Sequence, residues 1–411
     1  MSAAFSPNLR LPDPRVQVLD DSFLALRLMS GTVEQRATGF YWAEGPVWFG
    51  DGRFLLFSDI QNNRILRWDD CSGALSEFRK PSHHANGLAR DRQGPLLACE
   101  HGTRRVTRTG YDGRLTVLAS HFEGKPLNSP NDIVCRSDGS IWFTDPPFGI
   151  QGWWEGALAT PELPHGVYRI DPHTGVLAMV LHDLQGSNGV AFTPGEQSLY
   201  VAESRALPHR KIWLYDVQGT RLVNKRLFVD AGGPGAFDGI AVDVQGNVWC
   251  GLGSTGAVGA DAAEWDGARV YSPEGRPLGH IQLPERCAKL CFGGPRNNRW
   301  FMANSHALHA LHALPALHVN TRGAVWGRCG GRFTAPSRHQ KIDGRCWAPA
   351  ARGFAGRAPV RENARPRPAC HSRSGTRPLP SQRQAATRQP CRVASCAGFW
   401  PCGSSAPPRC D

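Results

Sequence analysis

A repeating unit of about 49 residues is the feature that most constrains the fold of this chain. Each copy has a short apolar strand, a turn of the x-Asp-Gly or x-Pro-Gly type, and a second strand rich in aromatic and β-branched residues. The copies begin at Gly45, Gly87, Asp132, Gly189, Gly239 and, more weakly, Lys289. Dense turn signals between short strands, without helical periodicity, predict an all-β protein.

The length of the repeat predicts a six-bladed β-propeller. A unit of 40–50 residues with about four strands is typical of a propeller blade. Six blades of this size need about 294 residues, and residues 16–324 supply them. Closing the ring removes unpaired sheet edges. We therefore expect an N-terminal strand near Val16 or Phe23 to join the last blade.

The last 87 residues, 325–411, differ in composition from the rest. Only eight of them are Val, Ile, Leu, Phe or Met, and they hold 16 Lys and Arg against three acidic residues. The other residues hold 31 basic and 32 acidic side chains, so the net charge of +12 comes from this tail. The charge therefore does not indicate nucleic-acid binding by the body. A segment this poor in apolar residues is expected to be disordered.

Two explanations for the tail stay open. A GC-rich gene that is translated out of frame yields sequence rich in Arg, Pro and Cys. We therefore favour an aberrant, frameshifted C-terminus. The alternative is a nucleic-acid-binding arm, which the charge allows but the lack of interleaved aromatic residues does not favour. The predicted division is an N-terminal extension (1–15), the propeller (16–324) and the tail (325–411).

The sequence predicts a cytoplasmic protein with a small-molecule partner. No run approaches the ~18 apolar residues of a membrane span. The first residues lack the basic region followed by an apolar run that marks a secretory signal. Six cysteines are scattered through the body without a Cys-x-x-Cys pair, as expected for reduced thiols in the cytosol. We expect no membrane partner and, for the body, no nucleic-acid partner. The sequence leaves the oligomeric state open.

The residue directly before each repeat start points to a metal site. Equivalent positions on the innermost strands of a propeller converge on its central channel. Here they are Glu44, Asn86, Asn131, Asn188 and Asp238, followed by Ala288. Carboxylate and amide oxygens suit Ca²⁺ or Mg²⁺ and tolerate Mn²⁺ or Zn²⁺. The alternative interpretation, Asx turns before glycine, does not account for Glu44. The pattern predicts one divalent metal ion.

These motifs resemble the SMP-30/gluconolactonase/LRE family, whose members are six-bladed propellers that bind one divalent metal and hydrolyse lactones. The resemblance covers about residues 20–324 and rests on EGPVW, LNSPNDIVCRSDGSIWFTDPPFGI, SNGVAF, FDGIAVDVQGNVW and CFGGPRNNRWFMA. It implies that Glu44, Asn188 and Asp238 hold the metal, with Ca²⁺ the first expectation, and that Asn131 contacts substrate or a metal-bound water. Animal relatives carry Arg where this chain has Ser129, so substrate recognition is expected to differ.

The predicted reaction is hydrolysis of a lactone, most simply a sugar lactone such as glucono-1,5-lactone. A cation polarises the carbonyl group and stabilises the oxyanion that forms when water attacks. As proposed for the family, Asp238 is expected to act as both ligand and general base, with Asp132 a weaker candidate for the base. Asp132, Glu100 and His101 are further expected to contact the substrate.

Other functions and sites stay open at this stage. The same scaffold can serve other lactones, phosphotriester hydrolysis or non-catalytic binding, because a fold does not fix a substrate. A lid over the pocket and packing in the core explain Trp153 and Trp154 equally well. Four histidines with helical metal-site spacing fall where blade six needs strands: His306, His309, His312 and His318.

Overall fold

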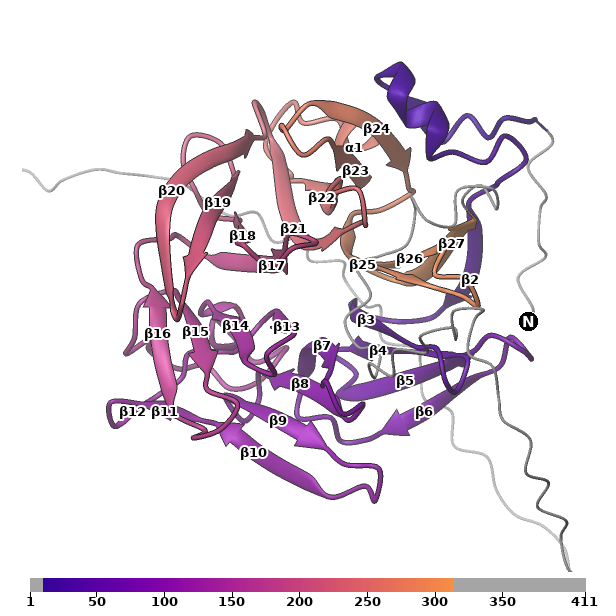
Figure 1. Cartoon of the computed structure of the whole chain (residues 1–411). Helices are drawn as coiled ribbons and strands as arrows, with labels where there is room; N and C mark the ends of the chain where they lie inside the picture. Colours follow the sequence, from indigo (N-terminus) through magenta and orange to yellow (C-terminus); the bar gives the residue numbers. More distant parts are fainter. Residues whose placement is uncertain (1–9, 313–411) are drawn as a thin grey trace, which may run out of the picture. The chain divides into compact units, whose positions relative to one another are not determined.

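The computed structural model describes residues 10–312, and over this range it confirms the predicted six-bladed propeller (Figure 1). Almost every element is a β-strand, and the described residues contain one α-helix, α1 (Ala262–Trp265). None of their helices is long and apolar enough to cross a membrane. The predictions for the tail, 325–411, lie outside the described residues.

Blades one to four are antiparallel sheets of four strands each, with the first strand innermost (Figure 1). Blade one contains β3 (Ala43–Phe49), β4 (Phe54–Asp59), β5 (Arg64–Asp69) and β6 (Leu75–Arg79). Blade two contains β7 (Ala85–Arg90), β8 (Leu96–Glu100), β9 (Arg105–Thr109) and β10 (Leu115–Ala119). Blade three contains β13 (Ile133–Cys135), β14 (Ile141–Asp145), β15 (Gly166–Ile170) and β16 (Leu177–Leu181). Blade four contains β17 (Ser187–Phe192), β18 (Ser198–Glu203), β19 (Lys211–Gln218) and β20 (Arg221–Asp230).

Blades five and six each recruit a strand from the N-terminal segment. Blade five contains β21 (Gly235–Val242), β22 (Val248–Ser254), β23 (Gly267–Tyr271), β24 (Pro277–Gln282) and, outermost, β1 (Val16–Val18). Blade six contains β25 (Cys287–Gly293), β26 (Arg299–Asn304), β27 (Ala307–His312) and, outermost, β2 (Glu34–Thr38). A small hairpin of β11 (His121–Phe122) and β12 (Lys125–Pro126) lies between blades two and three in the chain.

The strand that closes the ring is not the predicted one. β2 pairs antiparallel with β27 and completes blade six. The segment at Val16 forms β1, but it pairs with β24 of blade five, and Phe23 lies in a 3-10 turn, Asp21–Ala25. The closing strand reads EQRAT and none of its residues is fully buried. Because it lacks alternating apolar residues, the hydrophobic pattern could not mark it.

Aromatic side chains fill the spaces between neighbouring blades. Trp249 of blade five packs against Trp300 of blade six, with ring centroids 4.1 Å apart. Trp142 of blade three meets Phe192 of blade four edge-on at 5.5 Å. Such pairs add about 0.5–1.5 kcal/mol beyond the area that they bury. The tryptophans on the second strands of blades three, five and six therefore help to hold adjacent blades together.

A glycine follows four of the five polar repeat positions, all but Asn131, and lets the inner strands approach one another. A Cβ atom on Gly45 would lie 2.3 Å from the carbonyl oxygen of Asn86, and one on Gly189 would lie 2.2 Å from that of Asp238. Any side chain there would force the neighbouring backbone outward. These glycines therefore keep the polar residues of adjacent blades within reach of one central cavity.

The histidine run forms a regular strand. β27 pairs with β26 on one side and with β2 on the other, so its histidines do not follow the helical spacing of a metal site. The buried His309 lies 3.0 Å from Asn304 through Nδ1 and Oδ1, whereas the exposed His306 pairs with Glu285. His318 lies outside the described residues.

Candidate active site

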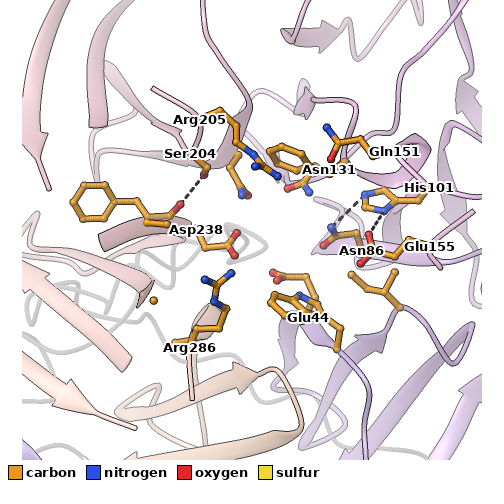
Figure 2. Close-up of a pocket in the computed structure, with 18 of the residues that line it drawn as sticks. Glu44, Asn86, His101, Asn131, Gln151, Glu155, Ser204, Arg205, Asp238 and Arg286 are labelled. Atoms are coloured by element: carbon orange, nitrogen blue, oxygen red, sulfur yellow. Dashed lines mark hydrogen bonds and ion pairs between the residues drawn. The ribbon is translucent and has the colours of Figure 1, made fainter. Parts of the chain in front are cut away.

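In four of the six blades, a local distortion of the inner strand accompanies a polar side chain that faces the centre of the ring. The pairing register shifts at Glu44 on β3, Asn86 on β7, Asn188 on β17 and Asp238 on β21. Extra residues of this kind bend a strand and redirect its side chains. Together with Asn131, which precedes β13, these residues line a single cavity of about 300 Å³ (Figure 2).

Two carboxyl groups on the cavity floor lack full compensation for their charge. Burial raises the pKa of Glu44 well above its usual range, and the nearby Asp238 raises it further. Burial also raises the pKa of Asp238 to about 7, against the opposing effects of Arg286 and of a hydrogen bond with Asn188. Two carboxyl groups that resist ionisation together favour a bound cation.

The oxygen atoms on this floor fit a hard divalent cation. Blades one, four and five each contribute one side chain: Glu44, Asn188 and Asp238. Within the described part of the chain, no three His, Cys, Asp or Glu residues gather in a way that could hold a metal ion. A cation here would therefore need amide oxygens as well as the two carboxylates, which is the mixed set that Ca²⁺ accepts.

One wall of the cavity is a hydrogen-bonded chain centred on His101. Its Nε2 lies 3.2 Å from Nδ2 of Asn86, and its Nδ1 lies 3.1 Å from Oε2 of Glu155. An amide nitrogen only donates, so with Asn86 in this orientation Nε2 accepts and the ring proton sits on Nδ1, facing Glu155. His101 is 1% exposed and lines the cavity. It is therefore held rigidly beside the space where a ligand binds.

Two loops form the mouth of the cavity. The segment between β14 and β15 brings Phe148 and Trp154, and the segment between β18 and β19 brings Arg205 and Arg210. Trp154 is 54% exposed, which places it at the cavity surface and not in the core. On the floor side, Arg286 donates to the backbone oxygen of Ser254.

Comparison with known proteins identifies the family of the chain. Residues 42–306 match the family described as the SMP-30/gluconolactonase/LRE-like region. Gluconolactonase of Zymomonas mobilis is 32% identical over 302 residues, which cover 68% of this chain and 80% of that protein. The chain belongs to the SMP-30/gluconolactonase/LRE-like family. This assignment agrees with the resemblance that the sequence motifs indicated.

Two further members show how the likeness extends. A gluconolactonase structure from Xanthomonas campestris shares 33% identity and a TM-score of 0.66, with 73% of this chain and 94% of that chain covered. The pentonolactonase XacC of Haloferax volcanii is 27% identical over 259 residues, covering 61% of this chain and 77% of that protein. The family relatives named here are thus lactone-hydrolysing enzymes with different sugar lactones in their names.

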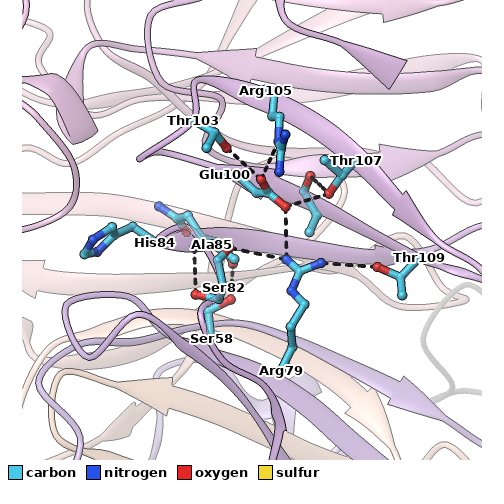
Figure 3. Close-up of polar contacts among 12 residues, drawn as sticks. Ser58, Arg79, Ser82, His84, Ala85, Glu100, Thr103, Arg105, Thr107 and Thr109 are labelled. Atoms are coloured by element: carbon cyan, nitrogen blue, oxygen red, sulfur yellow. Dashed lines mark hydrogen bonds and ion pairs between the residues drawn. The ribbon is translucent and has the colours of Figure 1, made fainter. Parts of the chain in front are cut away.

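Glu100 does not reach the cavity, contrary to the sequence-based expectation for this family member. Its carboxylate is fully buried and does not line the cavity that His101 lines, because successive residues of an extended chain point to opposite faces. Figure 3 shows the polar side chains that surround Glu100 instead. It accepts hydrogen bonds from four side chains: Arg79 (3.1 Å), Thr103 (2.7 Å), Arg105 (2.7 Å) and Thr107 (2.9 Å). The group therefore ties the strands of blade two together.

Asp132 also has a structural environment, and it does not line the cavity. Its Oδ1 forms an ion pair with Lys289 and accepts the backbone N–H of Ile133 at 2.8 Å. Its Oδ2 accepts the backbone N–H of Val190 at 3.0 Å. These contacts join blades three, four and six beneath the site. The geometry favours neither a substrate contact nor a general base at this position.

The sequence reasoning missed Glu155, Arg205 and Arg210 at the mouth, and it left Trp154 open between a lid and the core. All four residues lie in loops that carry no repeat pattern. For Glu155 and Trp154 the one sequence signal was the length of the insertion after Asp145, whereas Arg205 and Arg210 had none. The structure places Trp154 of that insertion on the cavity wall and leaves Trp153 73% exposed.

Proposed function

We propose that this chain is a divalent-metal-dependent lactonase that opens the ring of a sugar lactone. The observation that carries the proposal is the convergence of Glu44, Asn188 and Asp238, from three different blades, on one cavity. The reaction class is supported by relatives named gluconolactonase and pentonolactonase. Water attacks the lactone carbonyl carbon, the ring C–O bond breaks, and the departing oxygen takes up a proton to become a hydroxyl group.

The floor residues divide the work of this reaction. Glu44, Asn188 and Asp238 would hold the metal, with Ca²⁺ the first candidate and Zn²⁺, Mn²⁺ or Mg²⁺ as alternatives. When bound, the metal supplies Lewis-acid polarisation of the ester carbonyl. The carboxylate of Asp238 faces the cavity, so it is placed to take a proton from the attacking water. The positive charge of Arg286 nearby lowers the pKa of Asp238 and so favours its ionised form.

The walls of the cavity position the sugar. Asn86 and Asn131 offer amide groups to ring hydroxyls, and the neutral His101 between Asn86 and Glu155 fixes one of these amides. The exposed face of Trp154 suits stacking against a sugar ring. Ser129 has another role, because its Oγ donates to Pro146 at 2.5 Å and accepts the N–H of Gly149 at 2.9 Å. Ser129 therefore holds the start of the segment between β14 and β15 in place, and we assign it no contact with substrate.

A lactone panel tests this proposal. The purified chain is assayed with glucono-1,5-lactone, a pentonolactone, a non-sugar lactone and a phosphotriester. It is then treated with EDTA and reloaded with Ca²⁺, Zn²⁺, Mn²⁺ or Mg²⁺ in turn. We expect turnover of a sugar lactone that EDTA abolishes and one of these ions restores. Turnover of the phosphotriester alone, or of none of the four compounds, would contradict the proposal.

A further inference from the structure

We propose that the substrate carries an anionic group, a carboxylate or a phosphate, at the end remote from its lactone carbonyl, and that Arg205 and Arg210 bind this group. The inference rests on the proposed lactonase function and narrows its substrate class. Three arginines line the cavity: Arg205, Arg210 and Arg286. Arg286 has Asp238 and the Ser254 carbonyl oxygen beside it, but a neutral sugar lactone leaves the charges of Arg205 and Arg210 without a partner.

The two arginines at the mouth stand close together without a counter-ion. Burial lowers the pKa of Arg210, and the charge of Arg205 lowers it further. Neither guanidinium forms an ion pair with any acidic residue between positions 10 and 312. Their neighbours on the same loop, His209 and Lys211, both pair with Asp230, at 3.0 and 3.6 Å. The loop thus gives an acidic partner to the basic side chains that do not line the cavity and gives none to the two arginines that do.

Each of these arginines is built into the site. The Arg205 guanidinium lies over the ring of Phe148, 5.4 Å from its centroid, so an aromatic side chain of the neighbouring blade holds it in place. The Nε of Arg210 is buried and has no hydrogen-bond partner within the described range. A guanidinium group offers a planar fork of donors that matches a carboxylate or phosphate. The geometry therefore favours an anionic ligand over a hydroxyl group.

The distribution of charge sets the orientation of the substrate. Figure 2 shows the Arg205 and Arg286 guanidinium groups approaching from opposite sides of Asp238. When Glu44 and Asp238 are ionised and hold the metal, their two charges offset those of the cation, so the floor offers no excess positive charge to a carboxylate or phosphate of the substrate. Arg286 is engaged at the floor by the Ser254 carbonyl oxygen. The anionic group of the substrate therefore lies at the mouth, next to Arg205 and Arg210, while the lactone carbonyl group faces the floor.

Three lactones of one ring type test the inference: glucono-1,5-lactone, its 6-phosphate, and the analogue oxidised to a carboxylate at carbon 6. We expect kcat/KM for one anionic lactone to exceed that for the neutral lactone at least tenfold, and comparison of the two identifies the anion. Arg205→Gln should reduce this preference by about 10- to 100-fold, the usual worth of a charge-assisted hydrogen bond, mainly through KM. Arg221→Gln, an exposed arginine on β20 of the same blade, should leave the preference unchanged.

A binding measurement separates this inference from the proposed function. Glucarate, a linear dicarboxylate, and gluconate are titrated calorimetrically into the full-length protein and into Arg205→Gln and Arg210→Gln. We expect tighter binding of glucarate than gluconate, with the difference lost in both variants. If no lactone is hydrolysed but this difference is found, the lactonase proposal fails and the anion site stands. If neutral and anionic lactones react equally and both acids bind alike, the anion site is overturned and the lactonase proposal stands.

Discussion

The floor and the mouth of the cavity are built from different kinds of chain. The floor comes from the inner strands of the blades, where the same bulge and the same polar position recur from repeat to repeat. The mouth comes from the two segments after β14 and β18, which no other blade reproduces. Loops on a rigid scaffold commonly carry specificity. The comparison teaches that repeated positions hold the chemistry while singular loops select the substrate.

The largest expected effect comes from the floor. Asp238→Asn keeps the shape and an oxygen donor but removes the negative charge and the basic function. If Asp238 is both ligand and base, turnover should fall about 10²- to 10⁴-fold, the usual contribution of a positioned base. Excess metal should not restore it. The measurement is kcat with rising metal concentration, and the control is Asp216→Asn, a half-buried aspartate on β19 that does not line the cavity.

Two outcomes for Asp238→Asn would change this assignment. Recovery of activity at high metal concentration would limit Asp238 to metal binding, because the defect would then lie in affinity. Turnover near that of the unaltered protein would contradict both roles and would move the search for the base to His101, a titratable side chain held at the cavity wall by Glu155.

The next largest effect concerns the support beneath the floor. Lys289→Met removes one partner of the buried pair with Asp132 and leaves an uncompensated carboxylate, which costs about 3–5 kcal/mol of unfolding free energy. Adding Asp132→Asn should recover most of this loss, since the stranded charge is gone. Urea denaturation of the three variants measures the effect. Equal stability of Lys289→Met and the unaltered protein would show that Asp132 and Lys289 do not depend on each other.

A smaller effect is expected at the mouth. Trp154→Ala should raise KM for a sugar lactone about three- to tenfold, because it removes an aromatic face worth about 0.5–1.5 kcal/mol, while kcat changes little. The adjacent Trp153 is exposed and does not line the cavity, so Trp153→Ala is a matched control with no expected change. Equal effects of the two variants would show that the insertion acts as a whole and that Trp154 does not contact the sugar.

The sequence predicted the blades and the floor residues because both follow a pattern that recurs along the chain. Turn signals spaced by one blade length indicate the propeller fold. The polar residues before the repeat starts indicate which side chains face its central channel. Glu100 and Asp132 were misplaced for a physical reason. Residues next to a cavity residue point to the opposite face of the strand. A bulge interrupts this alternation, and no sequence pattern shows where the bulge lies. The closing strand β2 was missed because its exposed residues need no apolar pattern.

The mouth was beyond the reach of sequence patterns. Arg205 meets Phe148 across two blades, and Glu155 meets His101 across 54 positions in the chain. Each contact depends on how two irregular loops fold over the ring, and no spacing rule relates them. The pattern showed only that a long insertion exists, and the structure supplied the residues that it brings to the cavity.

Metal titration is the most direct test of the central claim that the inner strands converge on one cation site. Protein stripped with EDTA is titrated calorimetrically with Ca²⁺ and, in parallel, with Zn²⁺. We predict one ion bound per chain, with binding strongly weakened in Glu44→Gln and in Asn188→Ala, and unchanged in Glu100→Gln, whose side chain lies outside the cavity. The account would be contradicted if neither ion binds, or if binding survives the loss of Glu44 and of Asn188.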